Sequence, residues 1–406
     1  MTTTDHYSQT NFIKPDVARY RIMLVAGEPS GDALGGQLMM ALNQMADRPI
    51  DFIGVGGEAM TAQGLDSLYP IDDLAVMGLR EIVPRLPILL NRIRRAVDHG
   101  IESTPHLAIL IDSGDFNYRV ARGLKRKGFK APVVKFVSPQ IWASRPNRVF
   151  GLAKVFDHVL ALLPFEPKFY DRVNLPTTFV GHPVTERGTA RGQGPAFRER
   201  HNIPGDAKLL CVLPGSRINE IHYLMPVFGE TVKRLAQSFP DLHIVVPTVP
   251  NVAAEVKRAV TQWPKACVVT EGESAKFAAF DASDAALAAS GTVALELALA
   301  GVPTVIGYKV GWLTAAIARR FITVPYGTLT NLLLEREVVP EFVQERCTPE
   351  ALQASVTILL TDPNARTTQI NQLKEAIEML RIKGQRPSER AAETVLTLMR
   401  NHIAAA

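Results

Sequence analysis

Two short polar runs in the second half of the sequence combine residue types that bind phosphate groups and ribose. Residues 213–217 read LPGSR, and residues 290–296 read SGTVALE. Glycine and serine leave main-chain N–H groups open at a helix start, and the Arg217 guanidinium matches a diphosphate with two parallel hydrogen bonds. Glu296 lies one turn into an apolar helix, where it could accept from ribose hydroxyls, although a capping box with Thr292 would also explain it. The runs predict a nucleotide-sugar donor site formed by Gly215, Ser216, Arg217, Ser290, Gly291, Thr292 and Glu296.

A pair of carboxylates in the first half of the sequence is suited to proton transfer. The apolar run 106–111 ends in Asp112, and Asp115 follows in the segment DSGDFN. Carboxylates at the end of a buried strand, where parallel sheets bind their ligands, are candidates for a general base. We therefore expect Asp112 to be the catalytic base. Asp115 is expected to cap the following helix or to contact the acceptor.

Two further polar segments are candidates for the acceptor side of the site. Residues 27–32 read GEPSGD, so Glu28 and Ser30 could bind a phosphate or a sugar, although a helix cap by Ser30 or Asp32 would explain them too. The segment lacks the GxGxxG pattern and the P-loop lysine, which argues against a dehydrogenase or an ATPase. Residues 137–148 place Trp, Gln and two Arg directly after an apolar strand, types that stack on sugars and pair with phosphates. The predicted acceptor residues are Glu28, Ser30, Asp115, Gln140, Trp142 and Arg145.

These polar segments follow short apolar runs that alternate with helix-like stretches. Such alternation is typical of parallel sheets covered by helices on both faces. The expected strands are 21–26, 51–55, 106–111, 133–137, 158–161 and 178–180 in the first half, and 209–213, 243–246, 267–269, 285–288 and 304–307 in the second. The expected fold class is α/β, with two Rossmann-like doubly wound domains that face a central cleft. A Gly- and Arg-rich linker after residue 185 predicts an acceptor domain, 1–185, and a donor domain with C-terminal helices, 186–406.

Length and composition agree with two globular domains. The 406 residues exceed what one hydrophobic core usually serves, and 47% of them are hydrophobic against 21% charged. The formal net charge of +5 favours phosphate-bearing partners without indicating nucleic acid. Three widely spaced cysteines suit a reducing compartment and show no metal-ligand spacing, and no Asp-x-Asp motif accompanies the donor runs. We therefore expect neither a metal nor a cofactor.

Residues 79–97 mix large aliphatic side chains with five arginines and predict contact with a membrane surface. The arginines are Arg80, Arg85, Arg92, Arg94 and Arg95. Aliphatic side chains would enter the acyl region while arginines pair with lipid phosphates, although an amphipathic core helix fits almost as well. The sequence contains no run of about 18 apolar residues and its first residues do not resemble a signal peptide. We expect a cytoplasmic protein that binds the membrane peripherally.

Taken together, the motifs resemble those of the lipid A disaccharide synthase family, inverting glycosyltransferases with two Rossmann-like domains of the GT-B type. The resemblance runs from about residue 22 to 345 and includes AGEPSGD, LAVMG, DFN, VSP followed by Trp142, LPFE, LPGSR and ASGT. It implies condensation of UDP-2,3-diacylglucosamine with 2,3-diacylglucosamine 1-phosphate to a β-1,6-linked disaccharide and UDP, in lipid A biosynthesis. It also implies catalytic roles for Asp112, Arg217 and Asn331, no metal, and work at the inner face of the inner membrane. A homodimer is left open.

The sequence departs from the family pattern at three positions, and two other functions stay open. Gly114 and Thr330 stand where the family has proline, and Ser144 stands where a second tryptophan is common. These changes reshape turns without removing a charge, so they bear on acceptor and acyl-chain specificity more than on the chemistry. A UDP-sugar 2-epimerase of the same fold would leave the arginine-rich segment unexplained. A non-catalytic lipid-binding protein would have no reason to keep costly polar groups such as Asp112 and Glu296.

Overall fold

The computed structural model describes residues 18–71, 74, 79–188 and 191–405. The chain divides into two compact units, each built on one parallel β-sheet. The first unit comprises Met1–Ile141, Asn147–Gly181 and Ile382–Ala406, and the second comprises Trp142–Pro146 and His182–Arg381. The predicted α/β class with two doubly wound sheets is confirmed.

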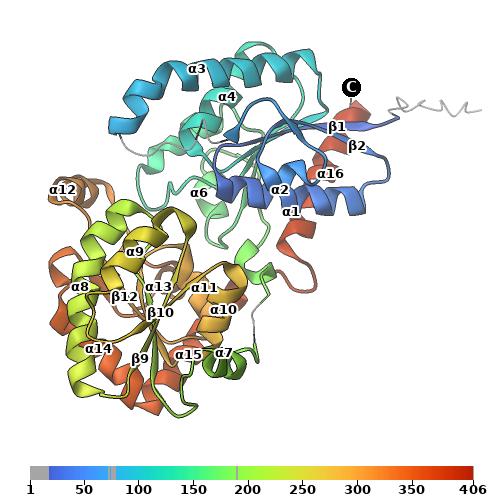
Figure 1. Ribbon diagram of the computed structural model, residues 1–406. Coiled ribbons are helices and arrows are strands. Elements are labelled where there is room, and N and C mark those ends of the chain that lie inside the picture. Colours follow the sequence, from blue (N-terminus) through green and yellow to red (C-terminus); the bar gives the residue numbers. More distant parts are fainter. Residues whose placement is uncertain (1–17, 72–73, 75–78, 189–190, 406) are drawn as a thin grey trace, which may run out of the picture. The chain divides into compact units, whose positions relative to one another are not determined.

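The first unit contains a seven-stranded sheet of order β3-β2-β1-β4-β5-β6-β7, with helices on both faces (Figure 1). Its strands are β1 (Tyr20–Ala26), β2 (Ile50–Val55), β3 (Asp66–Ser67), β4 (Leu107–Ile111), β5 (Val133–Phe136), β6 (His158–Ala161) and β7 (Thr177–Phe179). Its helices are α1 (Pro29–Met45), α2 (Glu58–Thr61), α3 (Leu79–Glu102), α4 (Gly114–Arg126), α5 (Val149–Leu152), α6 (Pro167–Asp171) and α16 (Pro387–Ala405). The central strands form because their apolar runs are buried on both faces; every residue of β4 is buried.

The second unit contains a six-stranded parallel sheet of order β10-β9-β8-β11-β12-β13. Its strands are β8 (Leu209–Leu213), β9 (His243–Thr248), β10 (Cys267–Glu271), β11 (Ala285–Ala289), β12 (Thr304–Tyr308) and β13 (Glu341–Val343). Its helices are α7 (Gly194–Arg200), α8 (Ile218–Ser238), α9 (Ala253–Val260), α10 (Glu273–Ala282), α11 (Thr292–Ala300), α12 (Trp312–Phe321), α13 (Leu329–Leu334), α14 (Pro349–Thr361) and α15 (Pro363–Met379). Helices α8, α9 and α14 pack on one face of this sheet.

Both sheets reverse their strand order at one point, and these points locate the sites. In the first unit the reversal lies between β1 and β4, and in the second it lies between β8 and β11. At such a point the connections leave in opposite directions and open a crevice beyond the carboxyl ends of the strands. The segments that follow these four strands are the predicted polar runs after residues 26, 111, 213 and 289.

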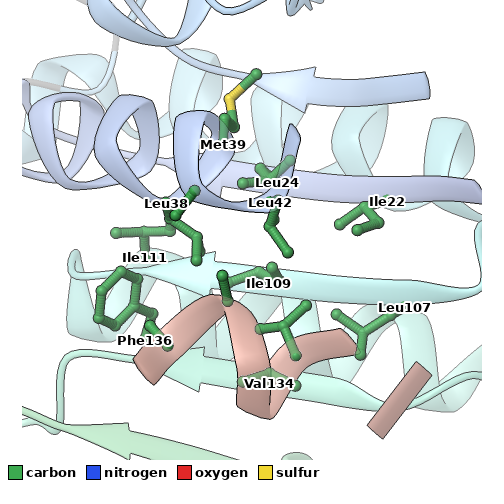
Figure 2. Packing of buried hydrophobic residues seen from close by; sticks show 14 of the residues in the cluster. Ile22, Leu24, Leu38, Met39, Leu42, Leu107, Ile109, Ile111, Val134 and Phe136 are labelled. Atoms are coloured by element: carbon green, nitrogen blue, oxygen red, sulfur yellow. The ribbon is translucent and has the colours of Figure 1, made fainter. Parts of the chain in front are cut away.

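The last helix, α16, completes the core of the first unit. Ala391, Val395 and Met399 are fully buried in one hydrophobic cluster with side chains of α1 and of the central strands. Figure 2 shows this cluster, with Leu38 and Leu42 of α1 pointing toward the strands. The predicted boundaries of 1–185 and 186–406 therefore differ from the observed division. The chain leaves the first unit after Gly181 and returns to it at Ile382.

Candidate active site

A cavity of about 270 Å³ opens at the carboxyl ends of β8, β9 and β11 in the second unit. Its walls are the turns after these strands and the first residues of α8 and α11. All seven predicted donor residues line it: Gly215, Ser216, Arg217, Ser290, Gly291, Thr292 and Glu296. The structure therefore brings these residues together at a switch point, and their contact with a donor stays a prediction.

A carboxylate that the sequence analysis missed holds the turn between β8 and α8. Glu220 accepts hydrogen bonds from the N–H groups of Ser216 at 2.9 Å and Arg217 at 3.3 Å, and from the Arg217 guanidinium at 3.0 Å. Gly215 has φ 117°, and a Cβ there would lie 2.4 Å from a Glu220 oxygen, so this position requires glycine. The Arg217 side chain, held by Glu220, stays 57% exposed and lines the cavity, so it is accessible to a ligand. A glutamate at the third helical position is a capping signal that could have revealed Glu220.

The start of α11 forms a second wall of the cavity. Gly291 occupies the N-cap position with φ 154°, and in the described part of the chain no side chain caps this helix. The capping box of Thr292 with Glu296 is therefore wrong. Gly291, Thr292 and Val293 all line the cavity, so the positive end of the helix dipole is directed at whatever occupies it.

Glu296 is buried, and two cations that the sequence analysis missed hold it in place. Its carboxylate forms an ion pair with Arg187 through one oxygen and with Lys276 through the other, at 2.8 Å in the second case. The acid therefore has protein partners, so its burial alone does not require a ligand. Glu296 and Lys276 both line the cavity, so they would lie beside a molecule that occupied it. Arg187 lies 109 residues away in sequence, so no local pattern could have indicated the pair.

Asn331 is fully buried behind the cavity and does not line it. Its side chain donates to the Val339 carbonyl at 2.8 Å and to Glu341 at 2.7 Å, and it accepts from the N–H groups of Val338 and Val339. Glu341 in turn accepts from the Gly327 N–H at 2.7 Å, and the Gly327 carbonyl accepts from the Ser290 hydroxyl at 3.1 Å. The structure thus links Asn331 to the cavity through a chain of hydrogen bonds, and its predicted catalytic role stays a prediction.

In the first unit, Asp112 lies on a strained turn directly after β4. Asp112 and Ser113 both have positive φ, 50° and 40°, which is costly for residues other than glycine. Main-chain and side-chain bonds hold the turn: the Asp112 N–H donates to the Phe136 carbonyl at 2.9 Å, and Asn117 donates to the Ile111 carbonyl at 2.7 Å and to the Asp112 carbonyl at 3.1 Å. The conformation of Asp112 is therefore fixed by the fold.

The GEPSGD loop lies beside this turn at the same switch point. The Ser30 hydroxyl donates to the Asp112 carboxylate at 3.3 Å, so the structure brings these two predicted residues together. Glu28 is the N-cap residue of α1, and no side chain caps this helix in the described chain. Asp32 instead accepts from the N–H groups of Gly57 and Ala59 and so caps α2. The prediction that Ser30 or Asp32 caps α1 is therefore wrong.

The other predicted acceptor residues are divided between the two units. Asp115 pairs with Arg148 at 2.5 Å, and within the described residues no side chain caps α4, so the capping role of Asp115 is wrong. Gln140 is an exposed residue of the first unit. Trp142 and Arg145 belong to the second unit, where the Arg145 guanidinium lies 5.5 Å from the centre of the Phe321 ring. The LAVMG motif lies almost wholly outside the described residues.

Lys135 is a fully buried cation beneath the Asp112 turn that the sequence analysis did not single out. It lies in β5, and its ammonium group donates to the Asp112 carbonyl. Burial lowers the Lys135 pKa to about 8, against the opposing effect of the Asp112 charge. The sequence feature that could have indicated Lys135 is a single lysine within an otherwise apolar strand.

Two properties of the described residues concern metal binding and membrane insertion. Among these residues no three His, Cys, Asp or Glu side chains are grouped so that they could hold a metal ion. In the same part of the chain no helix is both long enough and apolar enough to cross a bilayer.

Comparisons with known proteins agree with this arrangement. The model of the lipid-A-disaccharide synthetase family matches residues 22–395. The lipid-A-disaccharide synthase of Rhodospirillum centenum is 50% identical over 384 residues, 95% of this chain and 96% of that protein. Among solved structures, the UDP-GlcNAc 2-epimerase from Neisseria meningitidis bound to UDP-GlcNAc aligns with a TM-score of 0.61 at 12% identity, over 94% of this chain and all of that one. The calicheamicin glycosyltransferase CalG4 aligns with a TM-score of 0.59 at 15% identity, over 95% and 99% of the two chains.

Two parallel-sheet α/β units, each with a polar site at its switch point, give the chain the GT-B fold. The structural neighbours include epimerases, so the fold alone does not separate the two activities. The sequence match does: the chain belongs to the lipid-A-disaccharide synthetase family. Its activity is the glycosyl transfer that forms the lipid A disaccharide, and the epimerase alternative is not favoured.

Proposed function

We propose that the chain transfers diacylglucosamine from UDP-2,3-diacylglucosamine to the 6-hydroxyl of 2,3-diacylglucosamine 1-phosphate. The observation that carries this proposal is the position of the two polar residue sets, each at the switch point of its own sheet. The cavity of the second unit holds the donor's UDP group, and the Asp112 turn of the first unit serves the acceptor. Each unit supplies what one substrate requires.

In the proposed reaction Asp112 is the general base. Its carboxylate takes the proton of the acceptor hydroxyl while the hydroxyl oxygen forms a bond to the anomeric carbon of the donor. The bond from that carbon to the diphosphate breaks on the opposite face, so UDP leaves with the bonding electron pair and the configuration inverts. The Ser30 hydroxyl, 3.3 Å from the Asp112 carboxylate, helps to orient it.

The departing diphosphate gains negative charge, and groups of the second unit stabilise that charge. The exposed guanidinium of Arg217 and the uncapped start of α11 both border the cavity. Preorganised donors of this kind stabilise a developing anion without any reorganisation at the moment of reaction. Glu296, oriented by its ion pairs with Lys276 and Arg187, is positioned to accept from the ribose hydroxyls.

The test is the substitution Asp112→Asn, which keeps the shape of the side chain and removes its basicity. We expect turnover to fall by about 10²–10⁴-fold, the usual contribution of a general base. UDP binding, measured by calorimetry, should stay within about twofold of the wild type because the donor cavity lies in the other unit. Asp51→Asn is the matched control, since it changes another carboxylate of the same unit, one that pairs with Arg19. Disaccharide formation at the wild-type rate by Asp112→Asn would overturn the assignment.

Both proposed substrates carry acyl chains, and α3 supports contact with a membrane surface. The second half of the helix is a core element, because Ala96 and Val97 are buried. Three aliphatic residues nearer its start are exposed: Leu86 at 44%, Ile88 at 46% and Leu90 at 48%. Exposed aliphatics beside arginines are typical of an interfacial helix. We propose that this segment binds the cytoplasmic face of the inner membrane.

The structure also shows which substitutions test this contact cleanly. The guanidinium groups of Arg92 and Arg95 lie 4.8 Å and 5.6 Å from the centre of the Tyr69 ring, so reversing their charge would disturb packing. The better variant replaces Leu86, Ile88 and Leu90 by serine. Flotation with vesicles of phosphatidylcholine and phosphatidylglycerol should show a loss of roughly tenfold or more, because each fully buried aliphatic side chain contributes about 1.5–3 kcal/mol. The matched control replaces three exposed apolar residues elsewhere, Met45, Ile358 and Met379. Equal binding by both variants would contradict the proposal.

A further inference from the structure

The interior of the first sheet contains one lysine whose position is energetically unusual. Lys135 is 1% exposed and lies in β5, opposite Leu110 of β4. All four residues of β5 are buried, so the side chain has no route to solvent on either face of the strand. Burying an ammonium group is costly unless it gains strong compensating contacts. A lysine in this position therefore needs a partner whose contacts offset the free-energy cost of burying its charge.

The partner is the main chain of the Asp112 turn. The Lys135 ammonium group donates to the Asp112 carbonyl and, at 3.4 Å, to the Leu110 carbonyl. Asn117 donates to the Asp112 carbonyl from another direction, at 3.1 Å. Left-handed conformations are costly for residues other than glycine and persist only where the surroundings impose them. The two side chains impose the turn on Asp112 and Ser113.

Charged groups from several elements face Lys135. Asp112 from the turn and Glu28 from the loop before α1 favour its charged form, whereas Arg148 disfavours it. Asp115 from α4 reduces the effect of Arg148, because it pairs with that guanidinium. Burial outweighs these charges and lowers the Lys135 pKa to about 8. Lys135 is thus charged at neutral pH and becomes neutral just above it.

We infer that Lys135 is a positioning residue for glycosyl transfer, which holds the Asp112 turn through the Asp112 carbonyl and supplies the positive charge behind the Asp112 carboxylate. This inference rests on the proposed role of Asp112 as the general base. Lys135 touches no substrate and acts only through Asp112.

The arrangement has a pH signature that a purely structural lysine would lack. Below pH 8 the charge is present, and as the pH rises through 8 it is lost, so turnover should fall. Stability should move the other way. The unfolded chain has a lysine of ordinary pKa and binds more protons than the folded chain between pH 8 and about 10.4, so stability rises with pH in that window.

The experiment compares Lys135→Met and Lys135→Gln with the full-length wild type. For Lys135→Met we expect turnover to fall at least tenfold with donor KM within about twofold, and the decline of turnover above pH 8 to disappear. Lys135→Gln keeps a donor for the Asp112 carbonyl without the charge, so it should retain more turnover and also lack the decline. Between pH 8 and 10 the melting temperature of the wild type should rise relative to that of Lys135→Met.

Wild-type turnover and an unchanged pH profile in Lys135→Met would overturn the inference. If Lys135→Met does not fold, Lys135→Gln decides: turnover within twofold of wild type with the decline above pH 8 intact overturns it equally. Asp112→Asn separates this inference from the proposed function. Full activity in Asp112→Asn overturns the base assignment, whereas an inactive Asp112→Asn beside an unaffected Lys135→Met overturns only the role of the lysine.

Discussion

The two switch-point sites have opposite polarity. In the first unit a carboxylate, Asp112, stands at the end of the strand, and the cation Lys135 is buried behind it. In the second unit a cation, Arg217, and the positive start of α11 border the cavity, and the carboxylates Glu220 and Glu296, which also line it, are each paired with a cation. The first site thus presents a carboxylate with a buried cation behind it, whereas the second presents donors of positive charge beside carboxylates that are already paired.

This difference teaches how one topology serves two chemical demands. A base must keep a fixed orientation, and the first turn obtains this from strained residues held through their carbonyls. An anion site must leave N–H groups and a guanidinium available, and the second turn obtains this from Gly215 and Gly291, which allow the backbone to curve. The chemistry of each site follows from which main-chain groups the protein satisfies internally.

The largest expected effect comes from removing the charge that the second site presents. Arg217→Ala should lower kcat/KM by about 10²–10³-fold, or roughly 3–4 kcal/mol, because a preorganised donor to the departing anion is lost. Steady-state kinetics with both substrates measures it. Arg319→Ala is the control, since Arg319 is an exposed arginine of the same unit that pairs with Glu345. Equal effects of the two substitutions on kcat/KM would show that Arg217 has no special role in stabilising the departing diphosphate.

The next effect tests whether the second site depends on scaffolding behind it. Asn331→Ala should lower stability by about 3 kcal/mol, because the buried N–H groups of Val338 and Val339 lose their acceptor. Chemical denaturation measures it, with Asn251→Ala as the control because the bond from its side chain to the Ser216 carbonyl is exposed. A loss of turnover without any loss of stability would instead favour direct contact between Asn331 and substrate.

A smaller effect concerns the buried carboxylate beside the cavity. Glu296→Gln should weaken UDP binding by about tenfold, because the amide accepts less strongly from ribose hydroxyls and leaves Arg187 and Lys276 without a counter-charge. Isothermal calorimetry with UDP measures the change. Glu271→Gln, an exposed residue that pairs with Lys257, should leave binding unchanged. Undiminished affinity in Glu296→Gln would assign Glu296 a structural role only.

The smallest effect concerns the first helical position after the strained turn. Gly114→Ala should stabilise the protein by about 0.4–1 kcal/mol, since nothing lies within 4 Å of the added Cβ and the unfolded chain loses freedom. Thermal unfolding measures it. Gly27→Ala is the opposing control, because its Cβ would lie 2.2 Å from the Ser113 hydroxyl oxygen. Destabilisation by Gly114→Ala would show that the turn requires flexibility at that position.

Structural features that depend only on neighbouring residues could be predicted from the sequence. The buried strands are continuous apolar runs, and the runs LPGSR and SGT predicted the cavity of the second unit because glycine and serine at a strand-to-helix turn have a local cause. The strands β3 and β13 were missed because they have only two and three residues, too few to show a strand pattern. Departures at Gly114 and Thr330 proved to fall at the first turns of α4 and α13, where proline is also accommodated.

Features that join distant residues could not be predicted. Arg187 meets Glu296 across 109 positions, and Lys135 meets Asp112 across 23, so neither pairing leaves a pattern within one element. C-terminal helices were expected, but the sequence does not show that the apolar face of α16 packs on the first sheet, because the two are far apart along the chain. Asp115 was predicted to cap a helix, but its carboxylate forms an ion pair with Arg148 instead.

The return of the chain at Ile382 has a consequence for biosynthesis. A ribosome delivers every strand of the first sheet early, but α16, which covers Ile22 and Leu24 on one face, emerges only after the whole second unit has been translated. Until then one apolar face of the first sheet is covered by α1 but not by α16, and the exposed part favours chaperone binding. Translation arrested before Pro387 would release a chain whose second unit is complete and whose first unit is not.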